Sequence, residues 1–225
     1  MRKFYERYKH AIPLFIYAII YLSWFGYLER TVKRPTNLIH MSLDDKIPFC
    51  EIFIIPYLLW FAYVSSVVLY FFFKDKQDYY RNCAFLFTGM TIFLIVSTLW
   101  PNGHHLRPAA MPRDNIFSMM VSMLYKTDTP TNLWPSIHVY NSLGAHFAVL
   151  KNEKLRKKPV VRIGSLILCV SIILSTMFLK QHSIFDVLTA FIMAAVMYIV
   201  VYGFDIVTLW QTHRYGERRR RIRQV

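Results

Sequence analysis

The sequence predicts an all-α fold, a polytopic membrane bundle of six transmembrane helices, and two observations support this prediction. Of the 225 residues, 55% are hydrophobic and only 18% are charged, whereas soluble domains average about 25% charged residues. The apolar residues are concentrated in long runs, and the Lys and Arg residues lie between these runs. We therefore expect a single membrane domain over residues 1–225, with a basic tail from about residue 211.

Six apolar runs define the expected spans, because a helix needs about 17–25 residues to cross a bilayer. The runs are 11–28, 51–73, 83–100, 138–150, 163–179 and 184–209. The fourth is short unless its helix begins near Pro135. A further apolar segment, 116–125, is too short to span. It is expected either as an interfacial or re-entrant helix or as a loop packed on the bundle.

The distribution of basic residues predicts the orientation of the spans. Four Lys or Arg lie in residues 1–10, three in 74–82, six in 151–162 and six after Trp210, out of 27 in the chain. Because Lys and Arg are enriched on the cytoplasmic side of membranes, both termini are expected in the cytoplasm. The first outer loop, with four basic residues, runs against this pattern. The expected location is the plasma membrane.

This topology also explains the net charge of +14, so no nucleic-acid partner is expected. It places the polar residues at the outer ends of the third to sixth spans in one layer. The functional site is therefore expected at these non-cytoplasmic ends. A polar cavity is the least costly place for such residues in a membrane.

His182 lies just before the sixth span, and Asp186 lies four residues later, near the start of that span. On a helix this spacing places both side chains on one face. The carboxylate can then bind one imidazole nitrogen and leave the other unprotonated, which prepares the histidine as a nucleophile or a base. The alternative interpretation is a structural polar pair that joins two helix ends.

The residues Pro135-Ser136-Ile137-His138 precede the fourth span. Proline suits the first turn of a helix, and Ser136 can cap it. The free N–H groups of a helix N-terminus favour a phosphate, and His138 can donate a proton to a leaving alkoxide. The alternative is simple capping beside an interfacial histidine.

Two basic residues are candidates for binding a phosphate at the same level. Arg107, followed by Pro108, carries a planar fork that matches phosphate oxygens. Lys180 lies two residues before His182 and adds positive charge. The alternatives are an arginine that snorkels to the interface and an ordinary lysine at a span end.

Together these motifs resemble the signature of the type 2 phosphatidic acid phosphatase superfamily of membrane lipid phosphatases and phosphotransferases. The family pattern is KxxxxxxRP, PSGH and SRxxxxxHxxxD, and the third part here is most similar to the branch of the inositol phosphorylceramide synthases. The resemblance implies that His182 forms a phosphohistidine, that Asp186 orients it and that His138 protonates the leaving oxygen. Arg107 and Ser136 would bind the phosphoryl oxygens. No metal and no cofactor are implied.

The chain departs from the family pattern at three positions: Trp100 replaces the lysine, Ile137 the glycine and Thr176 the arginine of the third motif. His104 and His105 are candidates to replace the lysine. Lys180, one helical turn after Thr176, is the expected replacement for the arginine. The phosphate-binding residues are thus less closely matched than the catalytic ones.

The resemblance implies a lipid-phosphate phosphatase that hydrolyses a phosphomonoester or diphosphate of the phosphatidic acid or polyprenyl diphosphate class. One alternative is a phosphotransferase that moves a headgroup from a phospholipid to a lipid alcohol. Another is a non-catalytic membrane binding protein or transporter with the same fold. The expected partners are a phosphorylated membrane lipid and the bilayer.

Overall fold

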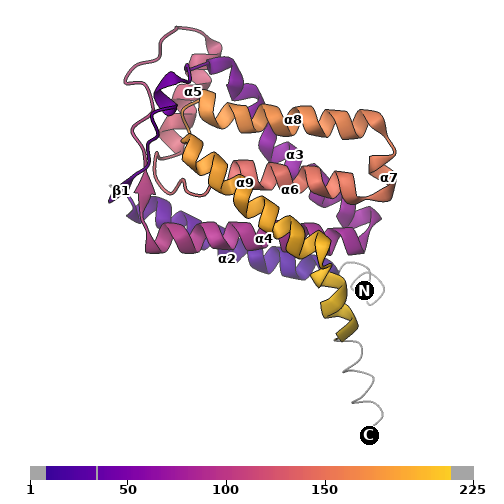
Figure 1. Cartoon of the computed structure of the whole chain (residues 1–225). Coiled ribbons are helices and arrows are strands. Elements are labelled where there is room, and N and C mark those ends of the chain that lie inside the picture. Colours follow the sequence, from indigo (N-terminus) through magenta and orange to yellow (C-terminus); the bar gives the residue numbers. More distant parts are fainter. Residues whose placement is uncertain (1–8, 34, 214–225) are drawn as a thin grey trace, which may run out of the picture.

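A computed structural model describes residues 9–33 and 35–213 of the chain as a bundle in which some helices run side by side and others cross them obliquely (Figure 1). The six long helices are α2 (Ile12–Thr31), α3 (Ile54–Lys74), α4 (Lys76–Leu99), α6 (Ile137–Lys151), α8 (Pro159–Phe178) and α9 (Ile184–Tyr198). The predicted all-α membrane bundle is confirmed. Most of the predicted basic tail lies outside the described residues.

Short elements join these helices at the two ends of the bundle. At one end lie the paired strands β1 (Asn37–Leu38) and β2 (Asn102–Gly103) and the helix α5 (Ile116–Thr127). Three single helical turns precede α2 or α3: η1 (Lys9–Ala11), η2 (Asp44–Lys46) and η3 (Glu51–Phe53). At the opposite end, α7 (Glu153–Arg156) joins α6 to α8.

Five described helices are long and apolar enough to cross a membrane: α2, α3, α4, α8, and α9 together with the π-helical turn η4 (Ile199–Gly203). The sixth, α6, has 15 residues, so it is only about 22 Å long against a hydrocarbon core of about 30 Å. The number of spans therefore stays a prediction.

The central position of α6 explains why its sequence is only weakly hydrophobic. This helix packs against α3, α4, α8 and α9, and residues 139–146 are buried without interruption. Polar side chains are tolerated there because neighbouring helices shield them from lipid. His146, for example, forms a hydrogen bond with the Ser165 hydroxyl at 2.9 Å.

Three predicted boundaries differ from the structure, mostly because charged residues begin or interrupt a helix. Residues 74–82 were expected as a loop, but α4 already starts at Lys76 with Asp75 as its N-cap. Likewise α8 starts at Pro159, within the predicted 151–162 loop. The last run is not one helix, because the chain breaks at Asp205 (φ 47°) before it becomes helical again over 206–213.

The short apolar segment is helical, as one of its two interpretations predicted. In α5, Val121 is fully buried and packs in a cluster with Ile54, Tyr57 and Leu179. Met119 and Met123 are exposed on the other side of the helix. This two-sided pattern is typical of a helix that lies at an interface, and the position of α5 relative to the bilayer stays a prediction.

The close packing of α4 on α6 gives a first testable prediction. A Cβ at Gly89 would lie 2.0 Å from the Tyr140 ring, whereas a Cβ at Gly164 would meet nothing within 4 Å. Gly89→Ala should therefore destabilise the fold by about 1–3 kcal/mol through overpacking. Thermal denaturation in detergent measures this change, and Gly164→Ala is the matched control. Equal denaturation temperatures for the two variants would contradict the packing described here.

Candidate active site

The site is built around the turn that joins α8 to α9. The Thr176 carbonyl accepts hydrogen bonds from the N–H groups of Gln181 and His182, at 2.9 and 3.0 Å. Ser183 then caps α9, its hydroxyl accepting from Phe185 N–H, while the Asp186 carboxylate accepts from Ser183 N–H at 3.0 Å. This reciprocal capping box fixes the backbone on both sides of His182.

His182, Asp186 and His138 form a line of hydrogen bonds. Asp186 Oδ2 lies 3.3 Å from His182 Nδ1, and His182 Nε2 lies 3.4 Å from His138 Nδ1. The predicted pairing is therefore present, but the two residues do not share a helix face as expected. His182 precedes the N-cap, and Asp186 reaches back to it from the first turn of α9.

His138 approaches from the N-terminus of α6. Ser136 is the N-cap of this helix, as predicted, and its hydroxyl accepts from Val139 N–H at 3.4 Å. Pro135 was expected in the first turn but lies before the cap, because the helix begins at Ile137. The Ser136 N–H also donates to the Asp186 carbonyl at 3.4 Å, which joins the starts of α6 and α9.

Aromatic rings from α3 hold the His138 ring in place. The imidazole stacks on Tyr57, with ring centroids 4.7 Å apart, and lies 4.4 Å from the ring of Trp60. The Tyr57 hydroxyl in turn donates to the Asp128 carboxylate at 3.3 Å. One face of the site is thus apolar and aromatic.

Burial keeps His182 neutral. Its side chain is only 5% exposed, and burial, aided by the nearby Arg107 charge, lowers the pKa of His182 to about 3. With Nδ1 donating to Asp186, Nε2 carries a lone pair that points at His138. A neutral imidazole with an oriented lone pair is chemically a nucleophile or a general base.

Arg107 lies beside this line but is already engaged. Its guanidinium donates to the carbonyls of Tyr125 and Asp128 at the C-terminal end of α5 and to Gln181 Oε1. The group also lies 4.4 Å above the Tyr125 ring. Its Nε is buried with no partner, so one donor of the fork remains available for an anion.

Lys180 does not point toward the histidine pair. Its Nζ donates to the carbonyls of Asp44 and Ile47, both at 2.6 Å. The position of Lys180 therefore does not support its predicted role as a replacement phosphate ligand. Lys180 instead holds the loop after β1 against the α8–α9 turn.

Two residues of the site were missed or undervalued in the sequence. Gln181 is buried, bridges Arg107 to the turn, and has an Nε2 group with no partner. His104 donates from Nε2 to the Gln181 carbonyl at 2.9 Å and accepts from Leu106 N–H at Nδ1. Both nitrogens of His104 are used, and burial lowers its pKa to about 4, so it acts as a neutral brace.

Asp44 was also missed, because it lies far from the motifs in sequence. Its carboxylate accepts from the Ser183 hydroxyl at 2.6 Å and from Ile184 N–H at 2.8 Å. A carboxylate at the start of α9 also complements the positive end of the helix dipole. The sequence gives no local signal for a contact that joins residues 139 positions apart.

The residues at which the chain departs from the family pattern have different structural surroundings. Trp100 packs edge-to-face on Trp134, 4.9 Å between ring centroids, and is no cation substitute. Thr176 is buried and bonded to the Ile173 carbonyl. His105 is exposed and lines a surface cavity of about 280 Å³ that also contains Lys180. Nothing among these described residues places a cation at the family's vacant positions.

Comparison with known proteins agrees with the motif analysis. The model of the PAP2 superfamily matches residues 106–206, which include every predicted site residue. Neither curated proteins nor solved structures gave a match. The resemblance inferred from the motifs is therefore confirmed, and the more specific similarity to one branch stays a prediction.

The neutral state of His182 predicts a pH-dependent stability. In the unfolded chain this imidazole titrates near pH 6.5, but in the folded protein only near pH 3. Between these values the unfolded state binds more protons, so stability falls as the pH falls. From pH 6.5 to pH 5 this group should remove about 2 kcal/mol. Thermal denaturation of His182→Gln should show a correspondingly weaker pH dependence, and an unchanged dependence would contradict the assignment.

Proposed function

With residues 106–206 assigned to the PAP2 superfamily, we propose that this protein is an integral membrane lipid-phosphate phosphatase. The superfamily assignment supports a phosphatase or phosphotransferase that acts on lipid-like substrates. The finer proposal is hydrolysis of a phosphomonoester or diphosphate of the phosphatidic acid or polyprenyl diphosphate class. One observation carries it: the hydrogen-bonded line of Asp186, His182 and His138.

In the first step, His182 Nε2 attacks phosphorus while Nδ1–H stays bound to Asp186. The N–P bond forms as the bond from phosphorus to the lipid oxygen breaks. His138, which takes up a proton when the anionic substrate binds, gives this proton to that oxygen, which leaves as the lipid alcohol. Asp186 stabilises the positive charge that develops on the His182 ring.

In the second step, water attacks the phosphohistidine. His138, now deprotonated, accepts a proton from the water as the new P–O bond forms and the N–P bond breaks. Inorganic phosphate leaves, and both histidines return to their initial protonation states. The same residue therefore serves as acid and then as base.

The donors around this line support a phosphate site. The first N–H groups of α6, at Ile137 and His138, have no partner within the helix and favour an anion. The buried donors without partners, Gln181 Nε2 and Arg107 Nε, lie next to the same turn. We assign phosphoryl binding to these groups and to Ser136. Lys180 belongs to the surrounding support.

The two rings must separate for the substrate to bind. A distance of 3.4 Å between His182 Nε2 and His138 Nδ1 leaves no room for a phosphoryl group. The simplest movement is a rotation of the His138 ring between Tyr57 and Trp60. Binding and ring displacement are therefore coupled in this proposal.

We also propose six spans, cytoplasmic termini and a site that faces away from the cytoplasm. The helix order supports this, because the loops 31–54, 99–137 and 178–184 all lie at the histidine end of the bundle (Figure 1). Basic residues of the described chain are frequent at the other end, over 151–162. The plasma membrane remains the predicted location.

The central experiment uses purified full-length protein with phosphatidic acid and with a polyprenyl diphosphate. Phosphate should be released without added divalent metal and in the presence of a chelator. His182→Ala should lose at least about a thousandfold in rate, because the proposed nucleophile is removed. Asp186→Asn should lose less, since the nucleophile remains but is poorly oriented.

His40→Ala is the matched control, because this exposed outer histidine pairs with Asp45 at 3.0 Å and does not contact the line. It should keep full activity. Phosphate release by His182→Ala at the wild-type rate would contradict the mechanism. Trapping of phosphohistidine on the wild type, and its absence in His182→Ala, would exclude a merely binding protein or transporter.

Phospho-headgroup transfer is the second candidate, and the closed environment of the site favours it. His182 is 5% exposed, and Tyr57 and Trp60 line the His138 side, so bulk water has little access. A lipid alcohol that enters between helices would then compete well with water. Incubation with a phospholipid donor and diacylglycerol or ceramide tests this. Hydrolysis without any new phospholipid would reject transfer.

A further inference from the structure

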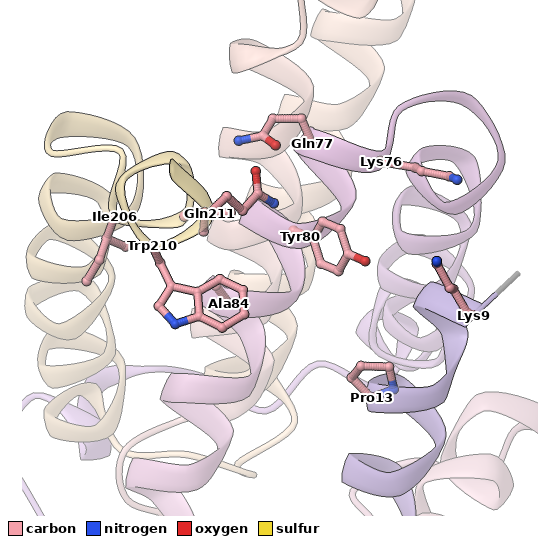
Figure 2. A pocket seen from close by; sticks show the side chains of 10 residues that line it. Lys9, Pro13, Lys76, Gln77, Tyr80, Ala84, Ile206, Trp210 and Gln211 are labelled. Carbon is pink, nitrogen blue, oxygen red and sulfur yellow. The ribbon is translucent and has the colours of Figure 1, made fainter. Parts of the chain in front are cut away.

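A second cavity, of about 970 Å³, lies at the end of the bundle opposite to the histidine pair (Figure 2). It is enclosed by the starts of α2 and α4 and by the helical residues 206–213. Its volume falls within the range of small-molecule binding sites. The lining residues are Lys9, Pro13, Lys76, Gln77, Tyr80, Ala84, Ile206, Val207, Trp210 and Gln211.

The lining changes from polar to apolar along the bundle axis. On α4, Lys76 and Gln77 lie in the first turn and Ala84 two turns further in. On the first helix, Lys9 precedes Pro13 by one turn, and Gln211 similarly lies one turn beyond Val207. Each wall is thus polar toward the end of the bundle and apolar further in. This gradient matches a lipid headgroup above its acyl chains.

The third wall is fixed by specific contacts. The helix breaks at Asp205, and the carboxylate of Asp205 accepts two hydrogen bonds, of 3.0 and 2.6 Å, from Arg81 on α4. The Gln77 side chain also donates to the Thr208 hydroxyl at 2.6 Å. These contacts hold residues 206–213 at a defined position beside α4. The cavity is therefore a built feature of the fold.

The electrostatics of the cavity favour an anion. Two of its described lining residues are lysines, Lys9 and Lys76, and none is acidic. Figure 2 shows the two lysines on one side, Trp210 and Ile206 on the other, and Tyr80 between them. Near Lys76 on α4, the Asp75 side chain caps the helix and Asp78 binds Arg81 and Asn152.

We propose that this cavity binds one anionic glycerophospholipid from the membrane leaflet at this end of the bundle, where the basic loop 151–162 also lies. Trp210 and Ile206 are 60% and 46% exposed, so the apolar wall is open to acyl chains, and Trp and Tyr are typical of membrane interfaces. Interfacial lysines attract anionic headgroups. The chain's own segment 214–225 is rich in arginine and has the wrong charge to occupy the site. The inference is independent of phosphoryl transfer, because the cavity and the histidines lie at opposite ends.

The test is thermal denaturation of the full-length protein in a mild detergent, titrated separately with phosphatidylglycerol, phosphatidylcholine and inorganic phosphate. Phosphatidylglycerol should raise the denaturation temperature at concentrations where the other two have no effect. The double variant Lys9→Gln/Lys76→Gln should need about thirtyfold more phosphatidylglycerol for the same shift. Lys157→Gln/Lys158→Gln, at the same end but outside the cavity, is the matched control and should respond like the wild type.

A third variant, Ala84→Phe, fills the apolar end without changing charge and should also lose the phosphatidylglycerol response. If the double lysine variant does not fold, Ala84→Phe still tests whether lipid binds in the cavity. If the control variant loses the phosphatidylglycerol response to the same extent, the response depends only on general surface charge, and the proposal is overturned. An equal shift with phosphatidylcholine or with inorganic phosphate would likewise overturn recognition of an anionic lipid.

Discussion

The Asp186 carboxylate is the group on which the site depends. One of its oxygens accepts hydrogen bonds from both Ser183 N–H and His182 Nδ1, so the same group starts α9 and orients the imidazole. The carbonyl of the same residue also accepts from Ser136 at the start of α6. A fully buried carboxylate without such donors would be very costly. The geometry of the histidine pair therefore follows from the way two helices begin.

The histidine half of the candidate site could be predicted from sequence because it follows local rules. Helix capping placed Ser136 correctly, and the spacing of His182 and Asp186 identified the pair, although through a capping box and not a shared helix face. The all-α membrane class followed from apolar runs. Helix starts were less predictable: α4 begins with Lys76-Gln77-Asp78, whose polarity hides a helical turn from any hydropathy argument.

The anion-binding half could not be predicted because it depends on paths of loops through space. Lys180 looked like a phosphate ligand by position, but it binds carbonyls of the loop after β1. Gln181, adjacent in sequence, instead links Arg107 to the catalytic turn. His104 and Asp44 contribute through contacts 77 and 139 residues away in the chain. No periodicity or short motif encodes such contacts.

The contact between Asp44 and Ser183 has a consequence for biogenesis. The loop that carries Asp44 is synthesised after only one long helix, α2, but its partners arrive with the turn between α8 and α9. Until then this acidic side chain has no helix N-terminus to bind, and the early part of the chain is incomplete. Loss of α8 and α9 would therefore leave a defect in the loop that carries Asp44 as well. Order in that loop thus reports that the turn between α8 and α9 has reached its place.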